Sequence, residues 1–124
     1  MKITATQAAA RARIAAGLAD VGFALPGTLS LQRYRCGKPT CRCRADPPQL
    51  HGPYAQWTRK IEAKTVTRRL SPSELADYGP LFDNAKRLRA LVAELQALTL
   101  AIVEAEADAR GHPRPRATRR TRSL

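Results

Sequence analysis

The chain of 124 residues has few aromatic side chains, few acidic ones and no long apolar stretch. Aromatic residues make up 5% of it, and the apolar fraction of 44% is mostly alanine and leucine, so we expect a thin, largely helical core. A core of that size leaves little room to enclose a small-molecule substrate. The sequence also lacks a glycine-rich phosphate loop and a nucleophile with a partnering base. These absences argue against an enzyme.

Membrane and export signals are also missing from the sequence. No apolar run approaches the roughly 20 residues that span a bilayer. The stretch 1–22 is interrupted by Arg11, Arg13 and Asp20, which is unlike a secretory signal. Three cysteines are an odd number, which excludes a closed set of disulfides and favours reduced thiols that are free to bind metal. We therefore expect a cytoplasmic, nucleoid-associated protein without a membrane partner.

Positive charge is abundant and unevenly distributed. The net charge is +12, of which residues 31–70 carry +8 and residues 110–124 carry +6, whereas residues 71–109 carry −4. Concentrated positive charge attracts polyanions, and each phosphate that it neutralises releases a condensed counterion. The alternative is a solvated basic surface that serves only solubility. Segregation of the charge by segment favours nucleic acid as the partner.

Periodicity and turn residues predict an α+β fold. Ser71, Pro72 and Glu74 have the pattern of a helix start, with a capping serine and a glutamate three residues later. The predicted elements are a helix over 4–21, strands over 28–36, 54–61 and 65–70, a short helix that starts at Ser71 and ends at Gly79-Pro80, and a long helix over 80–109. We expect one domain over residues 1–109, with a small three-stranded antiparallel sheet, followed by a disordered basic tail over 110–124.

The long helix carries leucines at heptad spacing. Its seam positions alternate steps of three and four residues and are Leu81, Asn84, Leu88, Leu91, Leu95, Leu98, Ile102 and Ala105. Such a seam packs against the first helix of the same chain or against a second copy in a homodimer, in which Asn84 would set the register. The apolar members of the seam are also the residues that a partner helix would contact.

The most specific local motif is a cysteine and histidine cluster. Cys36-Gly-Lys-Pro-Thr-Cys41-Arg-Cys43 is followed by His51-Gly-Pro-Tyr54, which places four metal ligands within sixteen positions. Three thiolates and one imidazole suit a structural zinc ion, and a thin core gives metal binding a role in folding. A Cys-x-Cys pair is tighter than the usual ligand spacing. Packed or free thiols, and a redox switch, are the alternatives.

Basic and aromatic residues alternate through the predicted sheet and its loop. The candidate nucleic-acid contacts are Arg33, Arg35, Lys38, Arg42, Arg44, Arg59, Lys60, Lys64, Arg68 and Arg69. A small sheet can enter the major groove of DNA, whereas Tyr34, Tyr54 and Trp57 are candidates for stacking on single-stranded bases. For Trp57 the alternative is a core anchor, because Ala55 and Ile61 share its face of the strand.

The Cys36-Gly-Lys-Pro, Cys41-x-Cys43 and His51-Gly-Pro-Tyr54 motifs resemble those of a family of short, uncharacterised bacterial and archaeal proteins. The resemblance covers about residues 25–103 and implies a genomic neighbourhood, since members are often encoded near transposases. The hairpin also resembles, in architecture only, the three-stranded DNA-reading sheets of some tyrosine integrases. We therefore expect a DNA-binding accessory protein of a mobile element. The alternatives are an adaptor that docks a recombinase or transposase through the heptad helix, and a single-stranded nucleic-acid binder.

Overall fold

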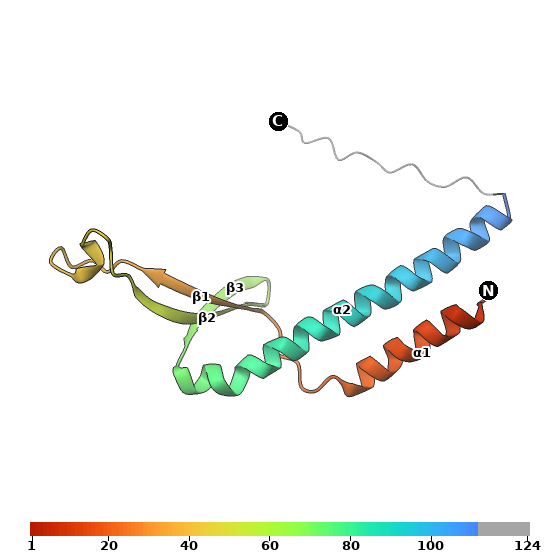
Figure 1. Ribbon diagram of the computed structural model, residues 1–124, viewed down its shortest axis with the longest axis horizontal. Helices are drawn as coiled ribbons and strands as arrows, with labels where there is room; N and C mark the ends of the chain where they lie inside the picture. Colours follow the sequence, from red (N-terminus) through yellow and green to blue (C-terminus); the bar gives the residue numbers. More distant parts are fainter. Residues whose placement is uncertain (112–124) are drawn as a thin grey trace. The chain divides into compact units, whose positions relative to one another are not determined.

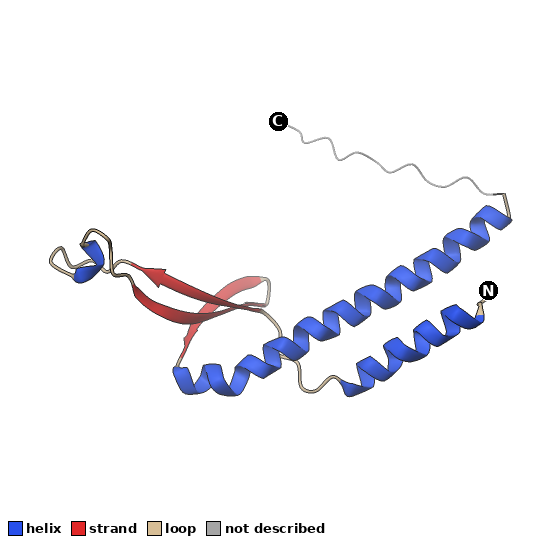
Figure 2. Ribbon diagram, viewed as in Figure 1, coloured by secondary structure: helices blue, strands red, loops and turns tan. Residues whose placement is uncertain are grey.

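The computed structural model describes residues 1–111 and has the predicted α+β architecture (Figures 1 and 2). Its elements, in chain order, are α1 (Ala5–Asp20), β1 (Thr28–Tyr34), the 3-10 turn η1 (Arg42–Arg44), β2 (His51–Ile61), β3 (Lys64–Leu70) and α2 (Pro72–Ala109). The described chain divides into a sheet unit, Val21–Leu88, and a helical unit made of Met1–Asp20 and residues 89–111. Of the predicted basic tail, residues 112–124 lie outside the described residues.

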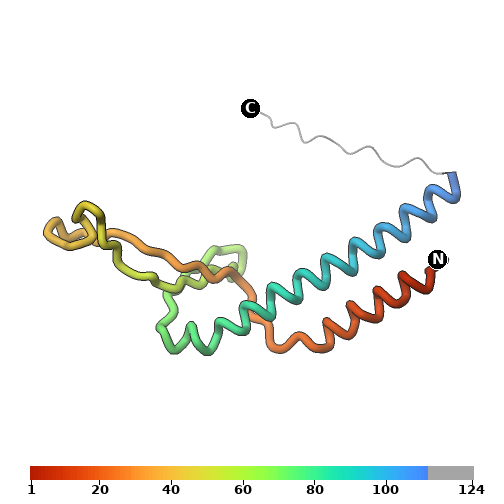
Figure 3. Tube along the Cα trace, viewed as in Figure 1, coloured from red at the N-terminus to blue at the C-terminus, as the bar shows by residue number. Residues whose placement is uncertain are grey.

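The three strands form one antiparallel sheet with β2 in the centre. Leu29 of β1 and Arg68 of β3 both pair with Trp57, whereas β3 ends at Leu70, opposite Ala55. The first residues of β2 therefore pair with β1 alone. The loop that joins β1 to β2 lies at this two-stranded end of the sheet (Figure 3).

Strand β2 starts three residues earlier than predicted, at His51, and continues across a proline. The register explains how, because Gln32 pairs with Tyr54 and Tyr34 pairs with His51. One residue of β1 therefore lies opposite two of β2, which is a β-bulge. Pro53 has no N–H to donate to a ladder, and a bulge is a position in a sheet that tolerates proline.

Helix α2 begins where the sequence predicted and contains no break. The Ser71 hydroxyl accepts a hydrogen bond from the Glu74 N–H (3.1 Å), and the Glu74 carboxylate accepts one from the Ser71 N–H (3.1 Å). This is the reciprocal capping box that the motif predicts.

The predicted end of a short helix at Gly79-Pro80 is wrong, because the helix runs through Pro80. Proline lacks the N–H that would bond to the carbonyl four residues earlier, which removes one helical hydrogen bond. Tyr78 and Phe82, on either side of Pro80, both pack in the core of the sheet unit. We attribute the continuity of the helix to this packing, which offsets the lost bond.

The core of the sheet unit lies between one face of the sheet and α2. Its buried members are Ala55, Leu70 and Phe82, and the partly buried residues that pack against them are Leu25, Leu29, Trp57, Leu75 and Tyr78. Trp57 donates its indole N–H to the Pro26 carbonyl (2.9 Å), and its ring meets Phe82 edge-on with centroids 6.1 Å apart. Trp57 is therefore part of the core, as its alternation with Ala55 predicts.

In the helical unit, α1 runs antiparallel to the second half of α2. Ile14 of α1 is 2% exposed, and Leu91 and Ile102 of α2 are buried. Gly17 permits a close approach, because a Cβ at that position would lie 3.0 Å from a Leu91 methyl carbon. Arg13 also forms an ion pair with Glu94 at 2.9 Å. Packing of the heptad seam against the first helix, one of the two predicted arrangements, is thus present.

The earlier seam residues lie in the sheet unit. Leu81 is half-buried, and its carbonyl accepts the Leu25 N–H (3.1 Å). Asn84 donates its side-chain N–H to the Phe23 carbonyl (2.9 Å), and Leu88 is 36% exposed.

Within residues 1–111, no helix is both long and apolar enough to cross a membrane.

Candidate metal centre and basic surface

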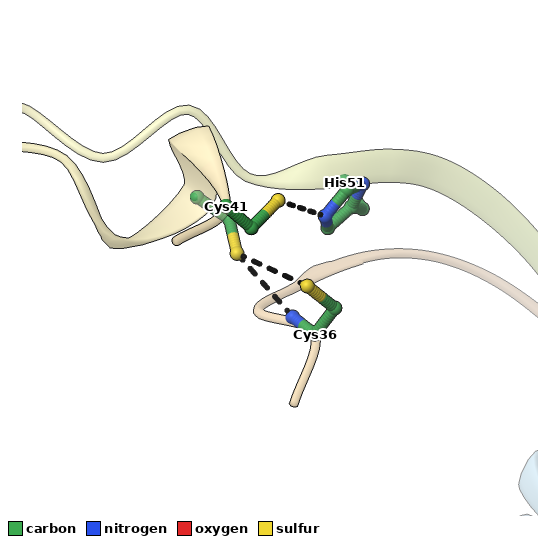
Figure 4. A group of neighbouring side chains, drawn as sticks. Cys36, Cys41 and His51 are labelled. Carbon is green, nitrogen blue, oxygen red and sulfur yellow. Dashed lines mark hydrogen bonds between the residues drawn. The ribbon is translucent and has the colours of Figure 1, made fainter. Parts of the chain in front are cut away.

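The four predicted metal ligands come together at the two-stranded end of the sheet (Figure 4). Cys36 lies just after the last residue of β1, Tyr34, which pairs with His51 at the start of β2. Antiparallel pairing therefore brings the start of the loop, where Cys36 lies, close to His51. The turn η1 then folds the loop back, with Cys41 at its N-terminal cap position and Cys43 inside it.

The ligand atoms have the separations of a metal-binding cluster. The Sγ atoms of Cys36 and Cys43 are 3.6 Å apart, and Cys41 Sγ lies 3.1 Å from His51 Nε2. All four atoms lie within 4.8 Å of one another. Zinc–sulfur bonds of about 2.3 Å in a tetrahedral site place the sulfur atoms about 3.8 Å apart. The four residues lie close enough to hold one metal ion between them.

Hydrogen bonds that each involve a backbone group fix the shape of the loop around these ligands. The Cys36 N–H donates to Cys43 Sγ (3.4 Å), and the Arg44 guanidinium donates to the Cys36 carbonyl (3.1 Å). The carbonyl of Arg42 accepts the N–H of Gln49 (3.2 Å), which closes the far side of the loop. Cys43 is fully buried, although most of the loop around it is exposed.

The environment separates the acidities of two of the thiols. The Cys43 N–H donates to the Cys41 sulfur and, with a smaller contribution from the Cys36 thiol, lowers the pKa of Cys41 from its ordinary 9.0 to about 6. Burial instead raises the pKa of Cys43. Cys41 is therefore largely a thiolate at neutral pH. A metal ion binds thiolates, so its binding at this cluster displaces the proton of Cys43.

The ten predicted basic contacts fall into three groups rather than on one surface. The loop group at the two-stranded end of the sheet contains Arg33, Arg35, Lys38, Arg42 and Arg44. The strand register places Arg59, Lys64 and Arg68 on the same face as Trp57, and Lys60 and Arg69 on the opposite face.

Two arginines of the strands pack against Trp57. The guanidinium carbon of Arg59 lies 3.7 Å from the centroid of the Trp57 ring, and that of Arg68 lies 5.6 Å from it. Arg68 also forms an ion pair with Glu74 at 2.8 Å. One Arg59 nitrogen is buried without a hydrogen-bond partner in the described part of the chain. This stack was not predicted from the sequence, although the spacing of two between Trp57 and Arg59 places both on one face of the strand.

The two candidate stacking tyrosines lie together, on the sheet face opposite to Trp57. The ring centroids of Tyr34 and Tyr54 are 5.1 Å apart, and the planes are tilted by 32°. The guanidinium carbon of Arg69 lies 3.9 Å from the centroid of the Tyr54 ring, and Arg69 donates a hydrogen bond to the Tyr34 hydroxyl. The structure thus brings together two of the three aromatic residues that were predicted to stack.

Comparison with protein families places the chain in one of them. Residues 6–78 match the model of a domain of unknown function, DUF6788, and include the whole metal-ligand cluster and the sheet. A comparison with curated proteins and with solved structures found no match. Because the matched region is more than half of the sequence, the chain belongs to the uncharacterised family that this domain defines.

Proposed function

We propose that the protein binds nucleic acid, with DNA favoured, through the basic residues of segment 31–70. The observation that carries the proposal is unbalanced charge. This segment contains ten basic residues and only two acidic ones, Asp46 and Glu62. Within residues 1–111, Arg68 is the only one of the ten that has a carboxylate within 4.0 Å. Unpaired cations at this density gain free energy by replacing the counterions of a phosphate backbone.

The metal that the cluster is proposed to hold is zinc, in a structural role. Three cysteines and one histidine form a common zinc-ligand set, and all four positions are filled by protein, as structural sites require. The loop between β1 and β2 buries almost no side chain other than Cys43, so packing contributes little to its order. Metal binding then supplies the free energy that holds the loop.

The proposed biological role is that of an accessory protein of a mobile element. It rests on the resemblance of the cysteine and histidine motifs to proteins encoded near transposases. The basic residues of 110–124 would add affinity that does not depend on DNA sequence, because they carry +6. Docking of a recombinase through the heptad helix is the less favoured role, since Leu91 and Ile102 are already buried in the helical unit.

Single-stranded nucleic acid is the second candidate ligand, and one observation favours it. Tyr34 and Tyr54 lie side by side beside Arg69, which is the combination that stacks on and neutralises a single strand. Comparing the affinity for a labelled 20-nucleotide strand with that for its duplex, before and after Tyr54→Leu, distinguishes the two ligands. A loss confined to the single strand would favour stacking.

The main test is a titration of a fluorescently labelled duplex, followed by anisotropy over 50 to 200 mM salt. We expect the affinity to fall steeply with salt and to fall further in Lys38→Glu and Lys64→Glu, two exposed lysines of segment 31–70. Lys86→Glu is the matched control, because it makes the same charge change on an exposed lysine of α2. Affinity that is absent, independent of salt, or lowered equally by all three variants would refute the proposal.

A further inference from the structure

A groove lies beside the metal-ligand cluster, between β1 and the loop that follows η1. Its volume is about 500 Å³, and its walls are Arg33, Arg42, Pro48, Gln49 and Leu50. Of these residues, only the two arginines were predicted from the sequence to contact nucleic acid. The groove combines two cationic side chains, one amide and two apolar side chains.

Within residues 1–111, the two arginines have no anionic partner of their own. Both are exposed, and in the described part of the chain neither has a carboxylate within 4.0 Å. Arg44, the next arginine along the loop, differs because it donates to the Cys36 carbonyl. Guanidinium groups stay charged at all physiological pH values, so the walls of the groove carry two uncompensated positive charges.

One wall of this groove belongs to the same loop as the metal-ligand cluster. Arg42 lies between Cys41 and Cys43, and Cys43 is fully buried. The backbone carbonyl of Arg42 also accepts the N–H of Gln49, another residue of the groove. Leu50, in turn, directly precedes the ligand His51. The groove wall thus depends on the same turn that supplies the metal ligands.

We infer that this groove binds a phosphate group of a nucleic-acid backbone. Arg33 and Arg42 approach from different segments and can pair with different oxygens of one phosphate, an arrangement that favours arginine over lysine. The Gln49 amide is a further donor, and Leu50 offers an apolar surface to the adjoining sugar. The inference rests on the proposed function and narrows it to one contact, which depends on the metal-bound loop.

The test compares Arg33→Gln and Arg42→Gln, singly and combined, with the matched control Arg35→Gln. Arg35 is an exposed arginine of the same loop group that does not line the groove. Binding of the labelled duplex is measured over a salt series, and zinc content is measured in parallel to show that the loop is intact. We expect each groove substitution to weaken binding about tenfold, with a smaller effect of Arg35→Gln. The double variant should lower the salt slope by about one, because both arginines contact the same phosphate.

A second readout separates the possible sources of the phosphate. The Nε–Hε resonances of Arg33 and Arg42 are followed by NMR in the zinc-loaded full chain during titration with inorganic phosphate, pyrophosphate or the duplex. Shifts that saturate with the duplex at its binding midpoint support the inference. Duplex binding that leaves both resonances and the salt slopes of the variants unchanged overturns the inference and leaves the proposed function standing. Shifts with phosphate or pyrophosphate but not with the duplex overturn the assignment to nucleic acid. Absence of duplex binding altogether, measured by anisotropy, overturns both the inference and the proposed function.

Discussion

The Sγ atom of Cys41 lies 3.1 Å from Nε2 of His51, ten residues further along the chain. This contact joins the turn η1 to the first residue of β2, at the end of the sheet that β3 does not reach. Tyr34 pairs with His51 across the same end, and Cys36 follows two residues later. A metal ion at this cluster would therefore hold β1 against β2 at the end of the sheet where β3 does not pair. Two isolated strands are marginally stable in water, so this end gains most from such a link.

Protein purified without chelator is expected to contain one zinc ion per chain, measured by inductively coupled plasma mass spectrometry. Cys41→Ser removes one of four ligands, so we expect the zinc content to fall and amide exchange in the loop between β1 and β2 to rise. His51→Gln should act in the same way. His112→Gln, at the only other histidine of the sequence, is the matched control. Zinc-free protein with three titratable thiols and an ordered loop would contradict the metal site.

In the metal-free protein, Cys41 should react with iodoacetamide before Cys43 as the pH rises. Its folded pKa of about 6 is below the ordinary 9.0, so the folded state holds fewer protons at this group between these values. This group therefore stabilises the fold fully above pH 9, and the stabilisation is lost as the pH falls through 6. Burial makes Cys43 the slower thiol, because its pKa is raised. Site-resolved mass spectrometry from pH 5 to 9 checks this order, which equal rates at Cys41 and Cys43 would contradict.

Local signals in the sequence predicted more of this structure than contacts between distant segments did. The Ser71 capping box and the alternation of Ala55 with Trp57 need only the residues beside them, and both are present. The break at Pro80 was predicted from a local rule, and packing of its neighbours against the sheet overrides that rule.

The candidate site shows the same division between local and distant signals. Cysteine and histidine types at close spacing predicted the ligand set, because these residues rarely cluster without a reason. The groove walls depend on how Arg33 of β1 meets Gln49 of the loop, sixteen positions away. No periodicity encodes that meeting, since it follows from the bulge and the fold of the loop. The sequence could therefore predict the metal ligands but not the groove.

Ser71→Ala is expected to lower the free energy of unfolding by about 1 kcal/mol, which is typical for loss of a helix cap. The hydroxyl of Ser71 accepts the Glu74 N–H at the start of α2, and alanine leaves that donor without its partner. Ser73→Ala is the control, because Ser73 contacts the Ser71 hydroxyl but does not cap the helix. Urea denaturation measures both variants. Equal losses in the two would show that the capping bond is not the cause.

Acid should destabilise the start of α2, and it should do so at a pH below the usual titration range of a carboxyl group. The Ser71 N–H, followed by the Arg68 guanidinium, lowers the pKa of Glu74 below 4.5. A depressed folded pKa means that the stabilisation is complete above 4.5 and is lost as the pH falls through the folded value. Glu74→Gln should therefore flatten the fall in stability at low pH. Urea titrations from pH 2.5 to 6 compare the variant with the parent, and parallel curves would contradict the assignment.

Trp57 is expected to act through the core rather than through bound bases. Trp57→Ala removes the ring that packs against Phe82 and beneath Arg59, and we expect a loss of about 3 kcal/mol in the free energy of unfolding. Trp57→Phe keeps most of that packing but loses the hydrogen bond to the Pro26 carbonyl, which costs about 1 kcal/mol.

A variant of Trp57 without an aromatic ring separates stability from binding. Phenylalanine still offers an aromatic face, so Trp57→Leu is added as a core-filling variant without one. If Trp57 only anchors the sheet, the folded leucine variant should bind duplex and single strand with the parent's affinity. Tyr54→Leu is the matched aromatic loss on the opposite face of the sheet, where stacking remains open. A fall in single-strand affinity with Trp57→Leu, but not with Tyr54→Leu, would overturn the core assignment and place the stacking surface on the Trp57 face.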